Sequence, residues 1–166
     1  VNLAASFAAT KRRVSLIDLD PLGNATMSSG VGRREPERSS YDVLLEGVSI
    51  VAARQSLQEP GYDLLAANDD LTAADMVFPN EQGRELKLKS ALEANIDDYD
   101  YVIIDCPPAL NMLTINALVA ANSVIIPTQC EYYALEGLSS LLQTVEKLRR
   151  LLNPGLKIEG FLRTMF

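Results

Sequence analysis

Two apolar segments that end in aspartate constrain this chain more than any other feature. The first, RRVSLIDLDPLGNAT, ends in Asp18 and Asp20, and the second, YDYVIIDCPP, ends in Asp105. Each apolar run is nearly continuous, which is typical of a strand buried on both faces of a parallel sheet. In an open α/β sheet, ligands bind at the carboxyl ends of the strands. The three carboxylates are therefore predicted to meet at that edge, where they suit a hydrated magnesium ion and a phosphate better than an organic anion.

The rest of the sequence alternates helical and strand patterns, which predicts an α/β fold with a doubly wound, mostly parallel sheet flanked by helices. The length of 166 residues fits one domain, predicted over 1–166. The opening VNLAASFAATKRR already has helical spacing, and 28–40 is a polar segment typical of a surface loop. The expected strands are 14–19, 62–66, 101–105, 123–127 and 157–162, and the expected helices are 42–45, 49–55, 69–77, 84–96, 110–121 and 134–152.

Composition excludes several classes of protein. The net charge of -7 argues against a surface that is wholly a nucleic-acid footprint, and the basic runs 11–13 and 147–150 are interpreted as cations at helix C-termini. With no histidine and no CxxC pattern, a zinc site is not expected, and Cys106 and Cys130 are interpreted as reduced thiols of a cytoplasmic protein. No apolar stretch approaches the roughly 18 residues of a membrane span.

A lone aspartate at a strand end is usually solvated and has no further role, but this sequence has three aspartates at the ends of two predicted strands. The D-x-D of Asp18 and Asp20, followed by proline and glycine and joined by Asp105, favours a metal and phosphate site. An apolar strand that ends in aspartate is also the form of a Walker B element, which holds magnesium in phosphate-binding ATPases. Phosphatases with an aspartyl nucleophile carry D-x-D as well. They are disfavoured here because Leu22 stands where that pattern has a small or β-branched residue, and no lysine is well placed downstream.

A family resemblance is carried by three segments, LIDLDPLGNATMSSGVG, YDYVIIDCPPALNMLTINALVAANSVIIPTQCEYYALEGL and IEGFLRTMF. They resemble the ParA/Soj chromosome- and plasmid-partitioning ATPases, relatives of MinD, over essentially the whole chain. The resemblance implies a P-loop NTPase-like fold of the deviant Walker A type. It also implies a protein that forms a homodimer around two ATP molecules and hydrolyses them slowly, stimulated by a ParB-like activating protein.

The same resemblance implies roles for individual residues, with ATP and Mg²⁺ as cofactors. Asp20 matches the catalytic aspartate, which positions the attacking water and contacts the magnesium shell. Asp18 matches an acidic residue that helps organise the phosphate-binding lysine and the metal, and Asp105 matches the Walker B carboxylate, which touches magnesium through water. The two switch segments supply further nucleotide-sensing positions, Gly23, Asn24, Pro107 and Pro108. For the prolines, simple strand termination remains an equal alternative.

The chain departs from the family pattern in several places. The K-G-G-x-G-K-T-T loop and the central strand before it are expected ahead of Val1, and the adenine contacts and basic DNA-binding surface are expected after Phe166. Leu22 stands where the family usually has Gln, and Asn111 where Gly is usual. The chain is therefore expected to be a fragment that is inactive alone and poorly stable, because the missing strand would leave unpaired sheet edges.

The predicted function is that of a fragment of a bacterial, nucleoid-associated ATPase for chromosome or plasmid segregation, which binds DNA non-specifically through regions outside this chain. One alternative is a non-catalytic interaction module without a P-loop. Another is a MinD-like ATPase that positions a different cargo, because one scaffold serves several biological roles.

Overall fold

A computed structural model describes residues 1–32, 34–94, 98–129 and 132–164, with the side chains of 75, 129 and 132–140 left out. Within it the chain forms two compact units, Val1–Ala117 and Leu118–Phe166. Each unit is described by itself below. The single domain predicted over 1–166 stays a prediction.

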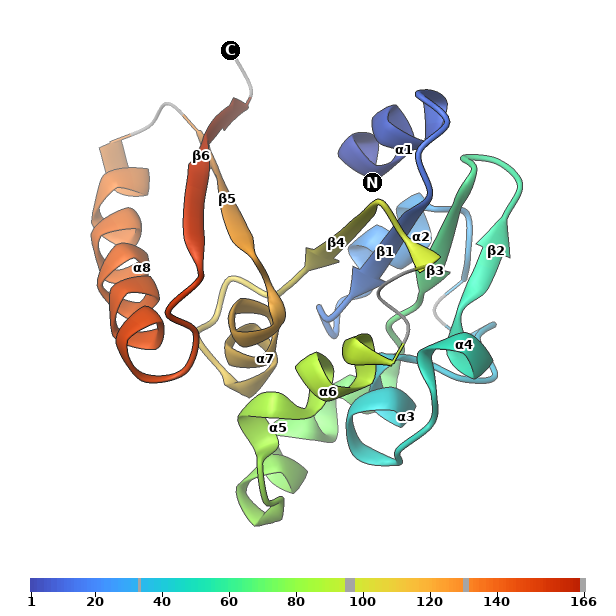
Figure 1. Cartoon of the computed structure of the whole chain (residues 1–166), viewed down its shortest axis with the longest axis horizontal. Coiled ribbons are helices and arrows are strands. Elements are labelled where there is room, and N and C mark those ends of the chain that lie inside the picture. The colour runs from blue at the N-terminus through green and yellow to red at the C-terminus, as the bar shows by residue number, and fades with distance from the viewer. Residues whose placement is uncertain (33, 95–97, 130–131, 165–166) are drawn as a thin grey trace. The chain divides into compact units, whose positions relative to one another are not determined.

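The first unit is built on a four-stranded sheet (Figure 1). Its strands are β1 (Val14–Asp18), β2 (Gln55–Leu57), β3 (Tyr62–Leu65) and β4 (Tyr101–Asp105), in the order β2-β3-β1-β4. β1 pairs in parallel with both β3 and β4, whereas β2 is antiparallel to β3. The prediction of a mostly parallel α/β sheet is confirmed.

β1 occupies the centre of this sheet because it can be buried on both faces. Each of its five residues is at most 3% exposed. Leu16 packs into a core cluster with residues of β3 and of α1 (Asn2–Ala9), and Ile17, which alternation places on the opposite face, is fully buried as well. The Phe7 ring of α1 also stacks on Tyr101 of β4, with ring centroids 4.3 Å apart. β1 is therefore buried along its whole length, and the Phe7–Tyr101 stack lies at its amino end, where Tyr101 pairs with Val14.

Short helices connect the strands of this unit. The α-helices are α2 (Asn24–Ser28), α3 (Ser40–Leu45), α4 (Ile50–Ala53), α5 (Ala74–Val77), α6 (Lys87–Glu93) and α7 (Met112–Ala120), and the 3₁₀ helices are η1 (Asp69–Ala73), η2 (Phe78–Asn80) and η3 (Arg84–Leu86). α3 begins with a capping box, in which Ser39 and Asp42 satisfy backbone donors of the first turn.

Three predicted helices differ from the structure. The helix expected over 49–55 ends at Ala53, and the chain turns back through a hairpin in which Gly61, at φ 86°, takes the left-handed conformation that favours glycine. The segments 69–77 and 84–96 each begin as a 3₁₀ turn before continuing as α5 and α6. α6 ends at Glu93, and 95–97 lie outside the described residues.

The second unit is a β-α-β unit. β5 (Ser123–Gln129) and β6 (Lys157–Thr164) are parallel, with a bulge between Val124 and Ile125, and α8 (Tyr132–Leu151) connects them (Figure 1). The Asn153 amide donates to three carbonyl oxygens at the end of α7 and just beyond it, over distances of 2.8 to 3.2 Å. None of the helices among the described residues is long and apolar enough to cross a membrane.

The two basic runs differ in their relation to helix ends. Arg149 and Arg150 lie in the last turn of α8, as predicted. The run 11–13 follows directly after the C-cap of α1, and the N–H groups of Lys11 and Arg12 donate to the Ala8 and Phe7 carbonyls at 2.8 and 3.4 Å, so this run lies just after the helix C-terminus. Arg13 forms an ion pair with Asp100, at 3.5 Å.

Candidate active site

The carboxyl ends of β1 and β4 bring two of the predicted aspartates side by side. Asp18 and Asp105 are opposite each other in the parallel register, and Leu19 N–H extends the ladder by donating to the Asp105 carbonyl oxygen at 2.8 Å. Asp20 follows immediately, where the chain leaves the sheet. The edge predicted from the sequence is therefore present, with three acidic residues on adjoining segments.

Asp18 is fully buried, and its carboxylate is bonded to its own chain. Oδ1 accepts from Asp20 N–H at 3.0 Å, and Oδ2 accepts from the N–H and the hydroxyl of Thr26 at 2.8 and 2.7 Å. These bonds place the first turn of α2 against the end of β1. Asp18 thus has a structural task that the sequence did not indicate, beside the role implied by the family.

Asp20 is half-buried and lies at the start of a tight turn. Its carboxylate accepts from Leu22 N–H at 3.0 Å, and its carbonyl accepts from Gly23 N–H at 2.8 Å. Gly23 is the N-cap of α2 with φ 64°, a conformation that disfavours side chains. Asn24 is the first residue of α2, and Leu22 is 59% exposed on the turn.

The segment after β4 carries the second group of predicted residues. Pro107 is buried, whereas Pro108 is exposed. The Thr114 hydroxyl of α7 donates to the Pro107 carbonyl at 3.1 Å and to the Ala109 carbonyl at 2.7 Å. Asn111 Oδ1 accepts from Thr114 N–H at 3.2 Å, which is the geometry of a helix N-cap. Asn111, unusual for the family, therefore has a local structural reason.

Burial, and then neighbouring acidic charges, raise the pKa of Asp18 and of Asp105. Burial raises the pKa of Asp18, although hydrogen bonds from Thr26 and Asp20 oppose that rise. Desolvation raises the pKa of Asp105, and the charges of Asp18 and Asp20 raise it further. No described lysine or arginine forms an ion pair with any of these three aspartates. An edge with uncompensated carboxylates favours a cation.

Magnesium fits this set of oxygen donors, though not as a dedicated cage. Among the described residues, no group of three or more His, Cys, Asp or Glu side chains is close enough to hold a metal ion. Mg²⁺ usually keeps several waters and takes one or two carboxylates plus phosphate oxygens. Asp20 and Asp105 are the two carboxylates left for this role, because Asp18 is already bonded to Asp20 and Thr26.

Sequence reasoning missed the residues that hold this edge together. Thr26 and Thr114 lie within the sequence motifs, but the motifs indicate no role for either residue. Ser40 Oγ donates to the Asp18 carbonyl at 2.6 Å and lies within 3.1 Å of the Ala66 carbonyl. A hydroxyl residue at the third position of a helix that follows D-x-D is the signal that could have found Thr26.

The thiol of Cys106 is half-buried beside Asp105. Burial raises its pKa to about 11, with a further contribution from the Asp105 charge, so the thiol is protonated at neutral pH. Cys106 is a free cysteine, in agreement with its interpretation as a reduced thiol. Cys130 lies outside the described residues.

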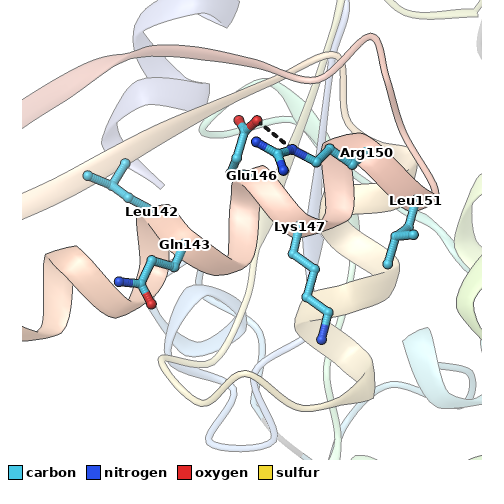
Figure 2. A pocket seen from close by; sticks show the side chains of 6 residues that line it. All are labelled: Leu142, Gln143, Glu146, Lys147, Arg150 and Leu151. Carbon is cyan, nitrogen blue, oxygen red and sulfur yellow. Dashed lines mark hydrogen bonds and ion pairs between the residues drawn. The ribbon is translucent and has the colours of Figure 1, made fainter.

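Two open hollows are present, one in each unit. One, of about 530 Å³, runs along α8 and includes the Glu146–Arg150 ion pair of 3.1 Å (Figure 2). The other, of about 470 Å³, is lined by three arginines, Arg12, Arg13 and Arg54, and lies at the amino ends of β1 and β3. Neither hollow contains a predicted site residue.

Comparison with known proteins matches this chain to one family. A family model described as "AAA domain" (AAA_31) matches residues 1–158. The chain is 47% identical to the sporulation initiation inhibitor protein Soj of Bacillus subtilis, over 99% of this chain and 65% of Soj. It is 46% identical to the chromosome partitioning protein ParA of Myxococcus xanthus, over 100% of this chain and 59% of ParA.

Solved structures give the same fold. One is named cobyrinic acid a,c-diamide synthase, from Mycobacterium smegmatis with bound ATP analogue and magnesium. It has a TM-score of 0.94 and 41% identity over 99% of this chain and 67% of its own. The chain spans 65% of the length of Soj and 59% of the length of the M. xanthus ParA.

Proposed function

This chain belongs to the AAA_31 family of AAA domains as a ParA/Soj-type member, and we propose that its complete protein is a magnesium-dependent ATPase that segregates chromosomes or plasmids. The observation that carries the proposal is the carboxyl edge of the first unit. There Asp18 and Asp105 lie opposite each other in the register, Asp20 follows on the adjoining turn, and no described lysine or arginine pairs with any of the three. In a bound magnesium nucleotide, the Mg²⁺ ion would supply positive charge at this edge and the phosphates would supply the anhydride bond to be cleaved.

Within this proposal the residues of the chain have separate tasks. Asp20 would be the catalytic residue that orients the attacking water beside the metal, and Asp105 would help to hold the magnesium ion, which would supply positive charge at the phosphates. Asp18 fixes the turn that carries Asp20 and keeps one acceptor position toward a phosphate-binding lysine. Gly23, Asn24 and Pro107 line the phosphate end of the nucleotide. The turn at Gly23 and the buried, hydrogen-bonded Pro107 carbonyl support fixed positions for these segments.

The proposed biological role follows the names of the relatives. We infer that the complete protein is a homodimer in its ATP-bound state, is activated by a ParB-like protein and binds DNA through regions outside this chain. Its proposed location is the nucleoid in the bacterial cytoplasm. Two relatives named as partitioning proteins or as Soj match the whole chain at 46% and 47% identity, which supports DNA as the cargo.

Three other functions share the same fold. A synthase, as the M. smegmatis structure is named, and a MinD-like ATPase would both use ATP and magnesium but would act on a different target. A non-catalytic interaction module would keep the fold and lose turnover. ATP-dependent DNA binding would distinguish a partitioning ATPase from the synthase and the MinD-like ATPase. ATP turnover would distinguish all three enzymes from the non-catalytic module.

The test uses the complete product of the reading frame that encodes this chain. Magnesium-dependent ATP turnover is measured with and without double-stranded DNA, and again with EDTA. We expect slow turnover that EDTA abolishes, together with DNA binding that requires ATP. Nucleotide-independent DNA binding or none would contradict the partitioning role, and absence of both turnover and nucleotide binding would contradict the ATPase.

A further inference from the structure

One hydroxyl at the start of α2 joins the carboxyl ends of two neighbouring strands. Thr26 Oγ1 donates to Asp18 Oδ2, after β1, at 2.7 Å and accepts from Ala67 N–H, after β3, at 2.9 Å. Thr26 is fully buried, so water cannot replace either bond. The position of α2 relative to the sheet therefore depends on this single side chain at two points.

The bonds to Asp18 leave little of its carboxylate free. Each carboxylate oxygen has about two acceptor positions. Oδ2 receives both the N–H and the hydroxyl of Thr26 and is filled, while Oδ1 receives Asp20 N–H at 3.0 Å. The carboxylate thus holds the start of the Asp20 turn with one oxygen and the first turn of α2 with the other.

The turn between these two points is short and bonded internally. Asp20 accepts from Leu22 N–H with its carboxylate and from Gly23 N–H with its carbonyl. Gly23 is the N-cap of α2, and Met27 N–H donates back to its carbonyl at 2.9 Å. Movement of α2 away from Asp18 would therefore move Asp20, because only a few bonded residues separate them.

We propose that Thr26 is a positioning residue that fixes Asp20 through the Asp18 carboxylate and the end of β3. The proposal rests on the proposed ATPase function, and it concerns the placement of Asp20 and not a contact with nucleotide. A purely structural hydroxyl would stabilise the fold without affecting the Asp20 turn. The two possibilities differ in what happens to the turn when the hydroxyl is removed.

The chain offers a matched set of variants. Thr26→Val keeps the side-chain shape and removes both hydroxyl bonds, whereas Thr26→Ser keeps the hydroxyl. Ser29→Ala is the control, because Ser29 is also a buried hydroxyl at α2. It bonds to the Ala25 carbonyl and the Tyr62 hydroxyl, both at 2.7 Å, and not to Asp18.

The experiment uses the complete protein, well below the melting temperature of every variant. The first readout is amide hydrogen exchange at Asp20 and Gly23 without nucleotide, and the second is kcat and KM for magnesium ATP. We expect Thr26→Val to speed exchange and lower kcat by about tenfold or more each, with KM within about threefold. Thr26→Ser should restore both values to near wild type, and Ser29→Ala should leave both unchanged.

Unchanged exchange at Asp20 in Thr26→Val would overturn the proposal, and so would an equal acceleration in Ser29→Ala. A wild-type protein without turnover would instead overturn the proposed ATPase. The exchange comparison needs no nucleotide, so in that case it still decides whether Thr26 fixes the turn.

Discussion

β4 is flanked by an aspartate at each end, and the two are treated in opposite ways. Asp100, just before the strand, accepts from Arg13 N–H at 2.8 Å and pairs with the Arg13 side chain, and these interactions lower its pKa. Asp105, at the last position of the strand, has no ion pair among the described residues, and desolvation and then the charge of Asp18 raise its pKa. Two aspartates five positions apart therefore have opposite electrostatic environments. Asp100 is stabilised by Arg13, whereas Asp105 lies at the end of the sheet that favours a bound cation.

The amino end of the sheet extends this contrast. Tyr99 donates to Asp63 at 2.6 Å and accepts from Arg54 at 2.5 Å, and Arg54 pairs with Asp63 and Asp98, both at 3.5 Å. Burial and the bond to Asp63 raise the pKa of Tyr99 to about 12, so its hydroxyl stays a donor. Here Arg54 compensates the charges of Asp63 and Asp98, and these bonds stabilise the hairpin of β2 and β3.

The largest expected effect on stability comes from comparing Asp18, at the carboxyl end of the sheet, with Asp63, at the amino end. Asp18→Ala leaves three donors unpaired in a dry site, because Asp20 N–H and both donors of Thr26 lose their acceptor. We expect the free energy of unfolding of the complete protein to fall by about 3 kcal/mol. Asp63→Ala should lower it by about 1 kcal/mol, since Asp63 is partly exposed and water can replace its bonds. Urea unfolding measures both, and equal losses would remove the distinction between the two ends.

The pH dependence should have opposite signs at the two ends of β4. A raised folded-state pKa means that ionised Asp105 costs stability above the unfolded value of 3.8, and that this cost disappears as the pH falls toward 4. A lowered pKa means that Asp100 contributes stability above 3.8, and that this contribution is lost as the pH falls through the folded value.

Asp105→Asn should therefore raise the urea midpoint of the complete protein at pH 7, and Asp100→Asn should lower it. The Asp105→Asn difference should shrink at pH 4, where the wild-type Asp105 carboxyl becomes protonated, whereas the Asp100→Asn difference should disappear only as the pH falls below 3.8 toward the folded-state value of Asp100. Measurement in buffer without magnesium keeps the acidic edge uncompensated. A shift of the same sign in both variants at pH 7 would contradict the opposite treatment of the two aspartates.

The smallest expected effect concerns the network at the amino end. Tyr99→Phe keeps the ring, which lies 5.6 Å from the Arg54 guanidinium, and removes the hydroxyl between Arg54 and Asp63. We expect thermal unfolding to show a loss of about 1 kcal/mol, with ATP turnover unchanged. A fall in turnover larger than the fall in stability would place this network in the functional machinery.

The sequence predicted the elements whose patterns are unambiguous. Continuous apolar runs placed β1 and β4 correctly, and Asp18 and Asp105 at their ends lie opposite each other in the register. The hairpin strand β2 was missed because three residues that are half-buried or exposed give no periodic signal, and they pair with β3 only through the turn at Gly61.

The candidate site was only partly predictable for a related reason. Motifs identify side chains that carry charge, such as Asp20 and Asp105, but not the neutral donors that hold them. Thr26 and Ser40 meet Asp18 only after α2 and α3 have packed against the strand ends. Their partners are eight and twenty-two positions away in the sequence, beyond the reach of local spacing.

The most direct test of this account is a comparison of one aspartate from each end of the sheet. ATP turnover by the complete protein is measured for Asp20→Ala and Asp63→Ala, below the melting temperature of both, with nucleotide affinity measured in parallel. The account predicts that Asp20→Ala lowers kcat by about a hundredfold or more while nucleotide still binds, and that Asp63→Ala keeps wild-type turnover. Equal turnover in the two variants would contradict the assignment of the chemical step to the carboxyl edge.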